Sequence, residues 1–139
     1  TGNTNGIAFT KALQTRDFEG LAFVNLVDFD MLYGHRRDVA GYAAAATEFD
    51  KFVADFIPGM REGDILMVTA DHGCDPSYTK TTDHTREYVP YLIYGKGIKP
   101  GVDLGTHLCF GTIAQTICEY LGVDASSLDG KSVWNEIKA

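Results

Sequence analysis

Two short apolar runs in this chain lead directly into aspartate and histidine, and this arrangement strongly constrains the fold. The run 20–27 leads into a loop that contains Asp30, and the run 65–69 leads into Asp71 and His72. Apolar runs of this length predict strands that are buried on both faces, as in a parallel sheet. Enzymes with such sheets place their reactive residues at the strand ends. The pattern therefore predicts an α/β protein with a polar site at one edge of its sheet.

Helices are expected between and after these strands. Asp38 has a side chain suited to an N-cap, and apolar residues recur at three- and four-residue spacing from Tyr42 to Phe56. The remaining expected elements are a helix at 7–14, a strand at 89–94, a helix at 110–121 that stops at Gly122, and a short helix near 132–137. Strands that alternate with helices indicate a three-layer α/β/α fold with a mostly parallel sheet.

Composition excludes several classes of function. The chain has 139 residues, about one domain, and a formal net charge of −7, which argues against nucleic-acid binding. No apolar run approaches the roughly twenty residues that a membrane helix needs, so we expect no membrane partner. The three cysteines, an odd number without paired spacing, favour reduced thiols and a cytoplasmic location. The sequence does not define an oligomeric state.

Aspartate and histidine gather in three clusters that suit divalent cations such as manganese or zinc. In the first, His35 follows Asp30 in a loop that contains a glycine, so both side chains could reach one ion. In the second, Gly73 permits the backbone turn that would bring Asp71 and His72 to the same cleft. The third contributes His84 from a polar loop. Together the clusters indicate most of a two-metal phosphoryl-transfer site.

Several neighbouring residues leave alternatives open. Asp28 could replace Asp30 as a ligand, and Asp83 is either a surface acid or a group that orients an imidazole. Cys74 and His107 are interpreted as non-ligands. The two arginines that follow His35 are either solvated charges or groups that face a phosphate.

These motifs resemble the phosphopentomutase family, which belongs to the alkaline phosphatase superfamily. The resemblance extends over nearly the whole chain and rests on the segments 25–38 (NLVDFDMLYGHRRD), 69–73 (TADHG), 82–90 (TDHTREYVP), 94–100 (YGKGIKP) and 103–106 (DLGT). The TADHG segment is common across the superfamily, whereas the first and third segments are much more specific to phosphopentomutases.

The resemblance implies a ligand set for two divalent metal ions, expected to be Mn²⁺. Asp30, His35 and His84 match the ligands of one ion, and Asp71 and His72 match ligands of the second. In the family, a further aspartate and a phosphorylated threonine complete the second site, and neither motif occurs here. Residues 1–139 are therefore expected to form the C-terminal part of the metal-binding core, without the N-terminal core segment, the cap domain or a catalytic residue.

The resemblance also implies the reaction of the intact enzyme. A phosphopentomutase interconverts ribose 1-phosphate and ribose 5-phosphate, or their deoxyribose analogues, through a phosphoenzyme, so the expected partner is a pentose phosphate. The alternatives are another superfamily member, such as a cofactor-independent phosphoglycerate mutase or a phosphomonoesterase, or a non-catalytic metal-binding fragment. For the 139 residues alone, we expect an inactive metal-binding fragment.

Overall fold

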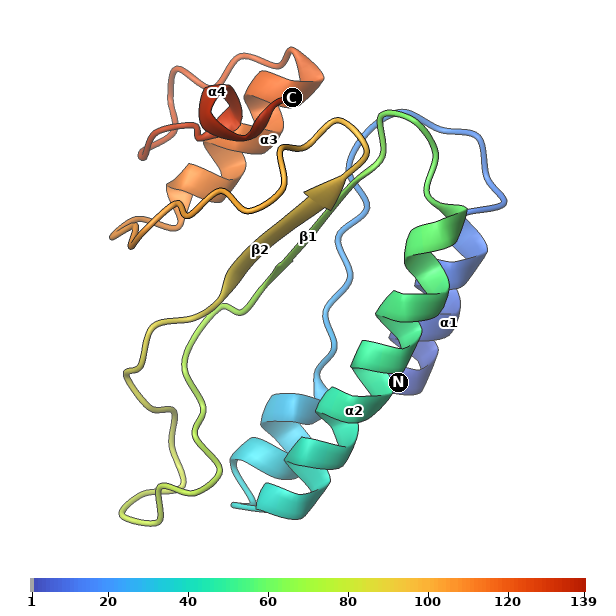
Figure 1. Ribbon diagram of the computed structural model, residues 1–139. Helices are drawn as coiled ribbons and strands as arrows, with labels where there is room; N and C mark the ends of the chain where they lie inside the picture. Colours follow the sequence, from blue (N-terminus) through green and yellow to red (C-terminus); the bar gives the residue numbers. More distant parts are fainter. Residues whose placement is uncertain (1) are drawn as a thin grey trace.

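The computed structural model describes residues 2–139 and shows a mixed α/β fold (Figure 1). Its elements in chain order are α1 (Asn3–Leu13), the π-helix η1 (Phe29–Gly34), α2 (Val39–Phe56), the 3₁₀ helix η2 (Ile57–Gly59), β1 (Ile65–Thr69), β2 (Tyr91–Gly95), α3 (Gly111–Leu121) and α4 (Trp134–Ile137). No helix in this described part of the chain combines the length and the apolar character needed to cross a membrane.

The two strands pair in antiparallel direction, so the expectation of a mostly parallel sheet is wrong for them. Ile65 of β1 lies opposite Gly95 of β2, and Thr69 lies opposite Tyr91. A parallel pair needs a crossover connection that carries the chain back along the sheet, usually through a helix. Here residues 70–90 form a long loop that leaves the end of β1 and returns to the start of β2, which leads to an antiparallel pair. The expected strand at 89–94 therefore begins two residues later, at Tyr91.

The apolar run 20–27 does not form the predicted strand. It forms neither a strand nor a helix, because a strand needs a ladder of backbone hydrogen bonds with a neighbour and the described residues form only the β1–β2 sheet. Val24 and Leu26 instead lie against Gly6 of α1. Phe23 in the same segment is 83% exposed. Apolar composition predicted burial here, but it could not supply the hydrogen-bonding partner that a strand needs.

The ends of several elements follow the predicted chemistry. The Asp38 carboxylate accepts a hydrogen bond from the Gly41 amide at 2.9 Å and caps α2, as its position predicted. Gly122 takes a left-handed conformation, with φ of 66°, and ends α3. Helix α1 begins earlier than expected, at Asn3, whose amide donates to the Asp28 carboxylate at 2.8 Å. The Asp28 carboxylate is therefore used as a hydrogen-bond acceptor at the start of α1.

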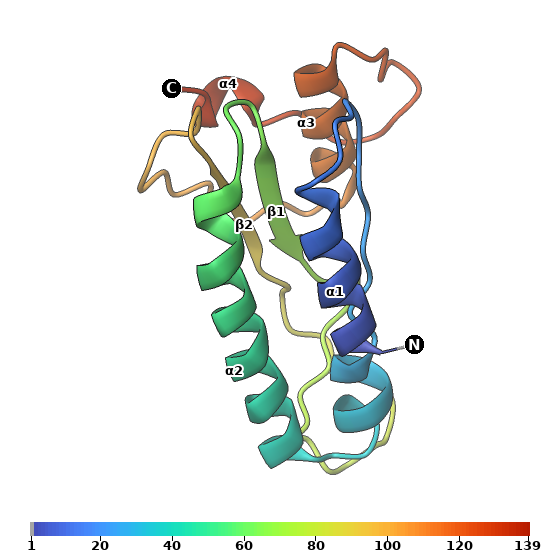
Figure 2. The same cartoon turned by 90° about the vertical axis from the view of Figure 1, so that its right-hand side faces the viewer.

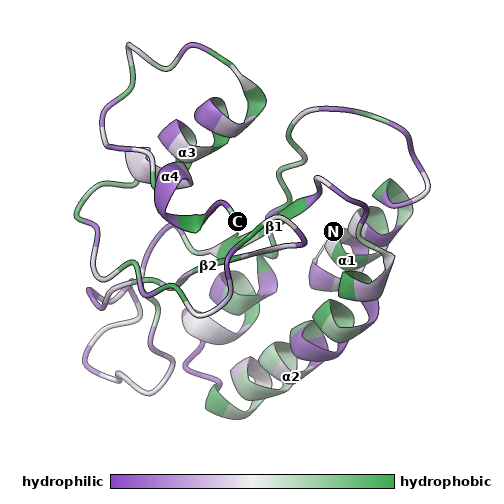
Figure 3. Cartoon of the chain, turned by 45° about the horizontal axis from the view of Figure 1, so that its top comes forward, coloured by the Kyte–Doolittle hydropathy of each residue, from purple (hydrophilic) through white to green (hydrophobic). Residues whose placement is uncertain are grey.

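The sheet lies between two groups of helices. Helices α1 and α2 run side by side on one side of it, and α3 and α4 lie on the other (Figures 1 and 2). The core is small: the buried apolar residues are Ala45, Phe52, Met60, Val133 and Ile137. Both strands consist mainly of hydrophobic residues (Figure 3). One of these residues, Leu92 of β2, remains 62% exposed. The described residues thus form a mixed α/β unit in which Thr69, Leu92 and Tyr94 of the sheet remain exposed.

Candidate metal centre

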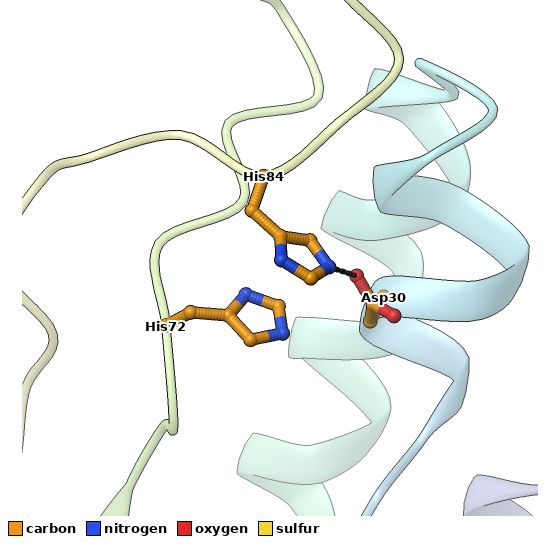
Figure 4. A group of neighbouring side chains, drawn as sticks. All are labelled: Asp30, His72 and His84. Atoms are coloured by element: carbon orange, nitrogen blue, oxygen red, sulfur yellow. Dashed lines mark ion pairs between the residues drawn. The ribbon is translucent and has the colours of Figure 1, made fainter.

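The long loop between β1 and β2 meets the short helix η1 at one end of the molecule. An isolated antiparallel bridge joins Gly73 to Thr85, and the Thr85 amide donates to the Gly73 carbonyl at 3.0 Å. This bridge ties together the two arms of the loop at the residues that follow His72 and His84. The third component, Asp30, comes from η1 (Figure 4).

Asp30 faces two imidazoles through a single oxygen atom. Its Oδ1 lies 3.4 Å from Nε2 of His35 and 3.5 Å from Nε2 of His84. Both separations are long for a hydrogen bond between a nitrogen and a carboxylate oxygen. The same Oδ1 atom is buried and has no hydrogen-bond partner. A buried carboxylate oxygen without a partner is costly, and it calls for a positive charge at this position.

The tautomer of His35 strengthens this conclusion. Its Nδ1 lies 2.5 Å from the carbonyl oxygen of Thr82, which can only accept, so Nδ1 carries the proton. In the neutral ring, Nε2 then directs its lone pair toward the Asp30 oxygen. Two acceptors that face each other are repulsive unless a cation lies between them. Metal–ligand bonds of about 2.0–2.2 Å place neighbouring ligand atoms roughly 3.0–3.6 Å apart, which fits the observed separations.

His72 completes a compact group with Asp30 and His84. Each of the three residues offers one ligand atom, and these atoms lie within 4.8 Å of one another. The Nδ1 of His72 is 3.1 Å from the Gly73 carbonyl, which again leaves Nε2 free to bind a metal. Imidazole and carboxylate ligands in this arrangement can hold a divalent cation.

Asp71 lies on the outer side of this group. Its Oδ1 is 3.6 Å from Nε2 of His72, and its side chain is 81% exposed. A groove of about 940 Å³ along β2 is lined by Asp71 and His72, whereas Asp30 and His84 do not line it. The five predicted ligands therefore lie in one region, with His72 between an inner side at Asp30 and an outer side at Asp71.

The other residues considered from the sequence have different roles. His107 is exposed and lies outside the Asp30–His72–His84 group. The Asp83 carboxylate accepts from the His84 amide at 2.8 Å, and this hydrogen bond is the main cause of the lowered pKa of Asp83.

Burial raises the pKa of the Cys74 thiol, and the neighbouring Asp30 raises it further. Cys74 does not belong to the Asp30–His72–His84 group.

One component of the site could not be found from residue types. The carbonyl of Thr82 fixes the His35 tautomer, and every residue carries such a carbonyl. A conspicuous charged side chain, Arg37, was noticed in the sequence, but its main-chain partners depend on how the loop folds back. Sequence motifs predict candidate ligands, whereas the groups that hold the His35 ring and the Arg37 side chain in place are main-chain carbonyls.

Comparison with known families places the chain in a class that fits this geometry. Residues 6–125 match the model of the metalloenzyme superfamily, so the chain belongs to that superfamily. Among curated proteins it is similar to the phosphopentomutase of Acetivibrio thermocellus, with 53% identity over 135 residues, which cover 97% of this chain and 34% of that protein. It is also 53% identical to the phosphopentomutase of Lachnoclostridium phytofermentans over 134 residues and 48% identical to that of Carboxydothermus hydrogenoformans over 136 residues. The chain spans about a third of the length of these relatives.

Proposed function

We propose that this chain provides the metal-binding part of a phosphopentomutase, an isomerase that interconverts (deoxy)ribose 1-phosphate and (deoxy)ribose 5-phosphate. The observation that carries the proposal is the buried Asp30 oxygen, which faces Nε2 of both His35 and His84 at 3.4–3.5 Å. Support for the particular reaction comes from relatives of about 50% identity that are phosphopentomutases.

The proposed site contains two divalent cations, with manganese as the expected metal. Asp30, His35 and His84 would hold one ion, and Asp71 and His72 would hold the second. The inner and outer sides of the cluster support this division, because Asp71 is exposed beside the groove and the Asp30 oxygen is buried. The outer ion has fewer ligands from this chain, so we expect the inner site to bind more tightly.

Divalent cations at these positions would neutralise a transferring phosphoryl group and align its attacking and leaving oxygens. The residues of this chain would hold and orient the site. Asp30 brings a negative charge to the buried side, and the Thr82 carbonyl keeps the proton of His35 on Nδ1. We assign no threonine of this chain as the phosphorylated nucleophile, and we expect the 139 residues alone to bind metal without mutase activity.

In the complete enzyme, we propose that this unit forms the C-terminal portion of the catalytic core within a three-layer α/β/α arrangement. The exposed apolar residues on β2 and in the 20–27 segment support additional packing partners for the sheet. The three cysteines are free, which supports a cytoplasmic enzyme.

A chimeric enzyme tests the proposed reaction. The matching 135 residues of the Acetivibrio thermocellus phosphopentomutase would be replaced by those of this chain, and conversion of ribose 1-phosphate to ribose 5-phosphate would be assayed with manganese. We expect an active chimera that loses activity with Asp30→Asn. A folded, metal-binding chimera that is inactive on ribose 1-phosphate but acts on 3-phosphoglycerate would contradict the assignment.

Manganese titration of the 139-residue chain tests the site separately from the reaction. Calorimetry should show one ion that binds more tightly than any second ion. Two sites of equal affinity would contradict the division of ligands proposed above, and no binding would contradict the metal site itself.

A further inference from the structure

The guanidinium group of Arg37 is fully occupied by main-chain carbonyl groups. Its Nε and Nη2 donate to the Thr81 carbonyl at 2.9 and 2.6 Å, and Nη2 also donates to the Asp83 carbonyl. Its Nη1 donates to the carbonyls of Gly34 and Asp75 at 3.1 and 3.0 Å. An arginine has five N–H donors, and these contacts use all five. Arg37 is therefore neither a solvated charge nor a group available to a phosphate.

These contacts hold the segment that supports two of the metal-site histidines. The Thr81 and Asp83 carbonyls lie on either side of Thr82, whose own carbonyl fixes the tautomer of His35. The residue after Asp83 is His84. A shift of this segment would thus displace His84 and remove the partner of His35 at the same time.

Arg37 also lies at the end of the segment that carries the other ligands. Gly34, the last residue of η1, is one of its partners, and Asp30 lies in the same short helix. The distant partners Asp75 and Thr81 belong to the loop between β1 and β2. The guanidinium thereby connects the η1 side of the metal site to the loop side.

The backbone of Arg37 is unusual in a way that suits this role. Its φ is 56°, and it is the only described residue other than glycine with a positive φ. A side chain in this left-handed region is uncommon and costs conformational energy. The five hydrogen bonds offset that cost, and a lysine could not reproduce them, because its ammonium has three donors at a single point.

We propose that Arg37 is a positioning residue for the metal centre, which aligns Asp30, His35 and His84 by clamping the loop to η1. This inference rests on the proposed function, since it requires that these residues bind a metal. It assigns to Arg37 an effect on the coordination of the ion, in addition to any effect on loop stability.

The variants are chosen to separate the clamp from the backbone strain. Arg37→Gly removes the guanidinium but accepts the positive φ, so the backbone can keep its conformation. Arg37→Lys keeps the charge and loses the planar fork. Arg36→Gly is the matched control: Arg36 is exposed, and its side chain has no hydrogen bond or ion pair with any residue from 2 to 139. Like Arg37→Gly, the Arg36→Gly variant loses one positive charge and gives the unfolded chain more conformational freedom.

Two measurements on the 139-residue chain test the proposal. Manganese affinity would be obtained from the loss of the free-ion electron paramagnetic resonance signal, and the visible absorption of bound cobalt would report the geometry of the ligands. Circular dichroism of the metal-free variants would establish that they fold. We expect manganese affinity to fall about 10–100-fold in Arg37→Gly, as for other groups that orient metal ligands, with a smaller fall in Arg37→Lys and a changed cobalt spectrum in both. Arg36→Gly should match the wild type.

The outcomes distinguish this inference from the proposed function. If the wild type binds no divalent cation, the proposed metal site fails and the role of Arg37 fails with it. If the wild type binds manganese and a folded Arg37→Gly binds it equally well with the same cobalt spectrum, only the positioning role is wrong. If Arg37→Gly fails to fold, the same comparison of manganese affinity and cobalt spectrum with the wild type is made for Arg37→Lys.

Discussion

The imidazole rings of His72 and His84 lie face to face, with centroids 3.6 Å apart and planes inclined by 16°. Both rings belong to the predicted ligand set, and neutral imidazole is the form that binds metal ions. The stack brings the outer part of the site at Asp71 next to the inner part at Asp30. His84 is therefore the central residue of the cluster, with Asp30 on one side and His72 on the other.

Removal of His84 should weaken metal binding more than removal of any group that only orients a ligand. We expect His84→Ala to lower manganese affinity by more than about 100-fold, since the loss of an orienting group alone costs 10–100-fold. Calorimetric titration of the 139-residue chain would measure the change. His107→Ala, at an exposed histidine outside the cluster, is the control and should bind as the wild type does. Equal affinities for the two variants would place the metal elsewhere.

Asp30→Asn should have opposite effects on metal binding and on metal-free stability. The amide retains the shape of the side chain but removes the charge, so manganese affinity should fall strongly. Without metal, the amide N–H₂ can donate to the lone pair on Nε2 of His35, where the carboxylate oxygen has no partner. We expect the metal-free variant to gain up to about 1 kcal/mol in free energy of unfolding.

Urea denaturation in the presence of a chelator would test the stability effect. Asp71→Asn is the control, because its exposed side chain should change metal-free stability by less than about 0.5 kcal/mol. A clear loss of metal-free stability in Asp30→Asn would show that the carboxylate has a structural partner and would weaken the argument for a cation beside it.

The sequence predicted those features that depend on local chemistry. The Asp38 cap and the glycine that ends α3 follow from interactions within a few residues, and both are confirmed. The predicted bounds of β1 are also confirmed, although this strand depends on its pairing with β2. The direction of the β1–β2 pair was mispredicted, because it depends on the path of the residues between the strands. The run 20–27 was mispredicted because its composition contains no information on whether a neighbouring strand is available.

The candidate site, like the fold, was only partly predictable from the sequence. Asp30, His35, Asp71, His72 and His84 were predicted as ligands from the sequence, and the structure brings them into one region. The groups that hold them could not be found in this way. The Thr82 carbonyl is chemically identical to any other main-chain carbonyl. Apart from Gly34, the partners of Arg37 lie about forty residues further along the chain, and only the folded loop brings them within reach.

Thr116 provides a test of the small core at the C-terminal end. Its hydroxyl is fully buried, donates to the Thr112 carbonyl at 2.7 Å and accepts from the buried Val133 amide at 3.1 Å. Thr116→Val keeps the volume but leaves that amide without a partner, so we expect a loss of roughly 1–3 kcal/mol in free energy of unfolding. Thr47→Val is the matched control, since Thr47 makes the same type of helix contact at an exposed position. If both variants lose the same stability, the Val133 contact contributes nothing specific.

Alkaline conditions should destabilise the chain in part through Tyr91. Burial raises the pKa of this phenol above its ordinary value of 10.0. As the pH rises past 10, the unfolded chain loses the Tyr91 proton while the folded chain retains it. The unfolded state then binds fewer protons, so the free energy of unfolding falls with pH, by at most about 1.4 kcal/mol per pH unit for one proton. The fall continues until the pH exceeds the folded-state pKa.

Tyr91→Phe should therefore show a shallower loss of stability between pH 10 and 11, because phenylalanine has no proton to lose. Urea denaturation at several pH values would measure the slope. The exposed Tyr88 provides the matched control, and Tyr88→Phe should retain the wild-type slope. Tyr42, whose pKa is also raised chiefly by burial, keeps part of the alkaline sensitivity in both variants. A slope in Tyr91→Phe identical to that of the wild type would mean that the phenol reaches solvent before the chain unfolds.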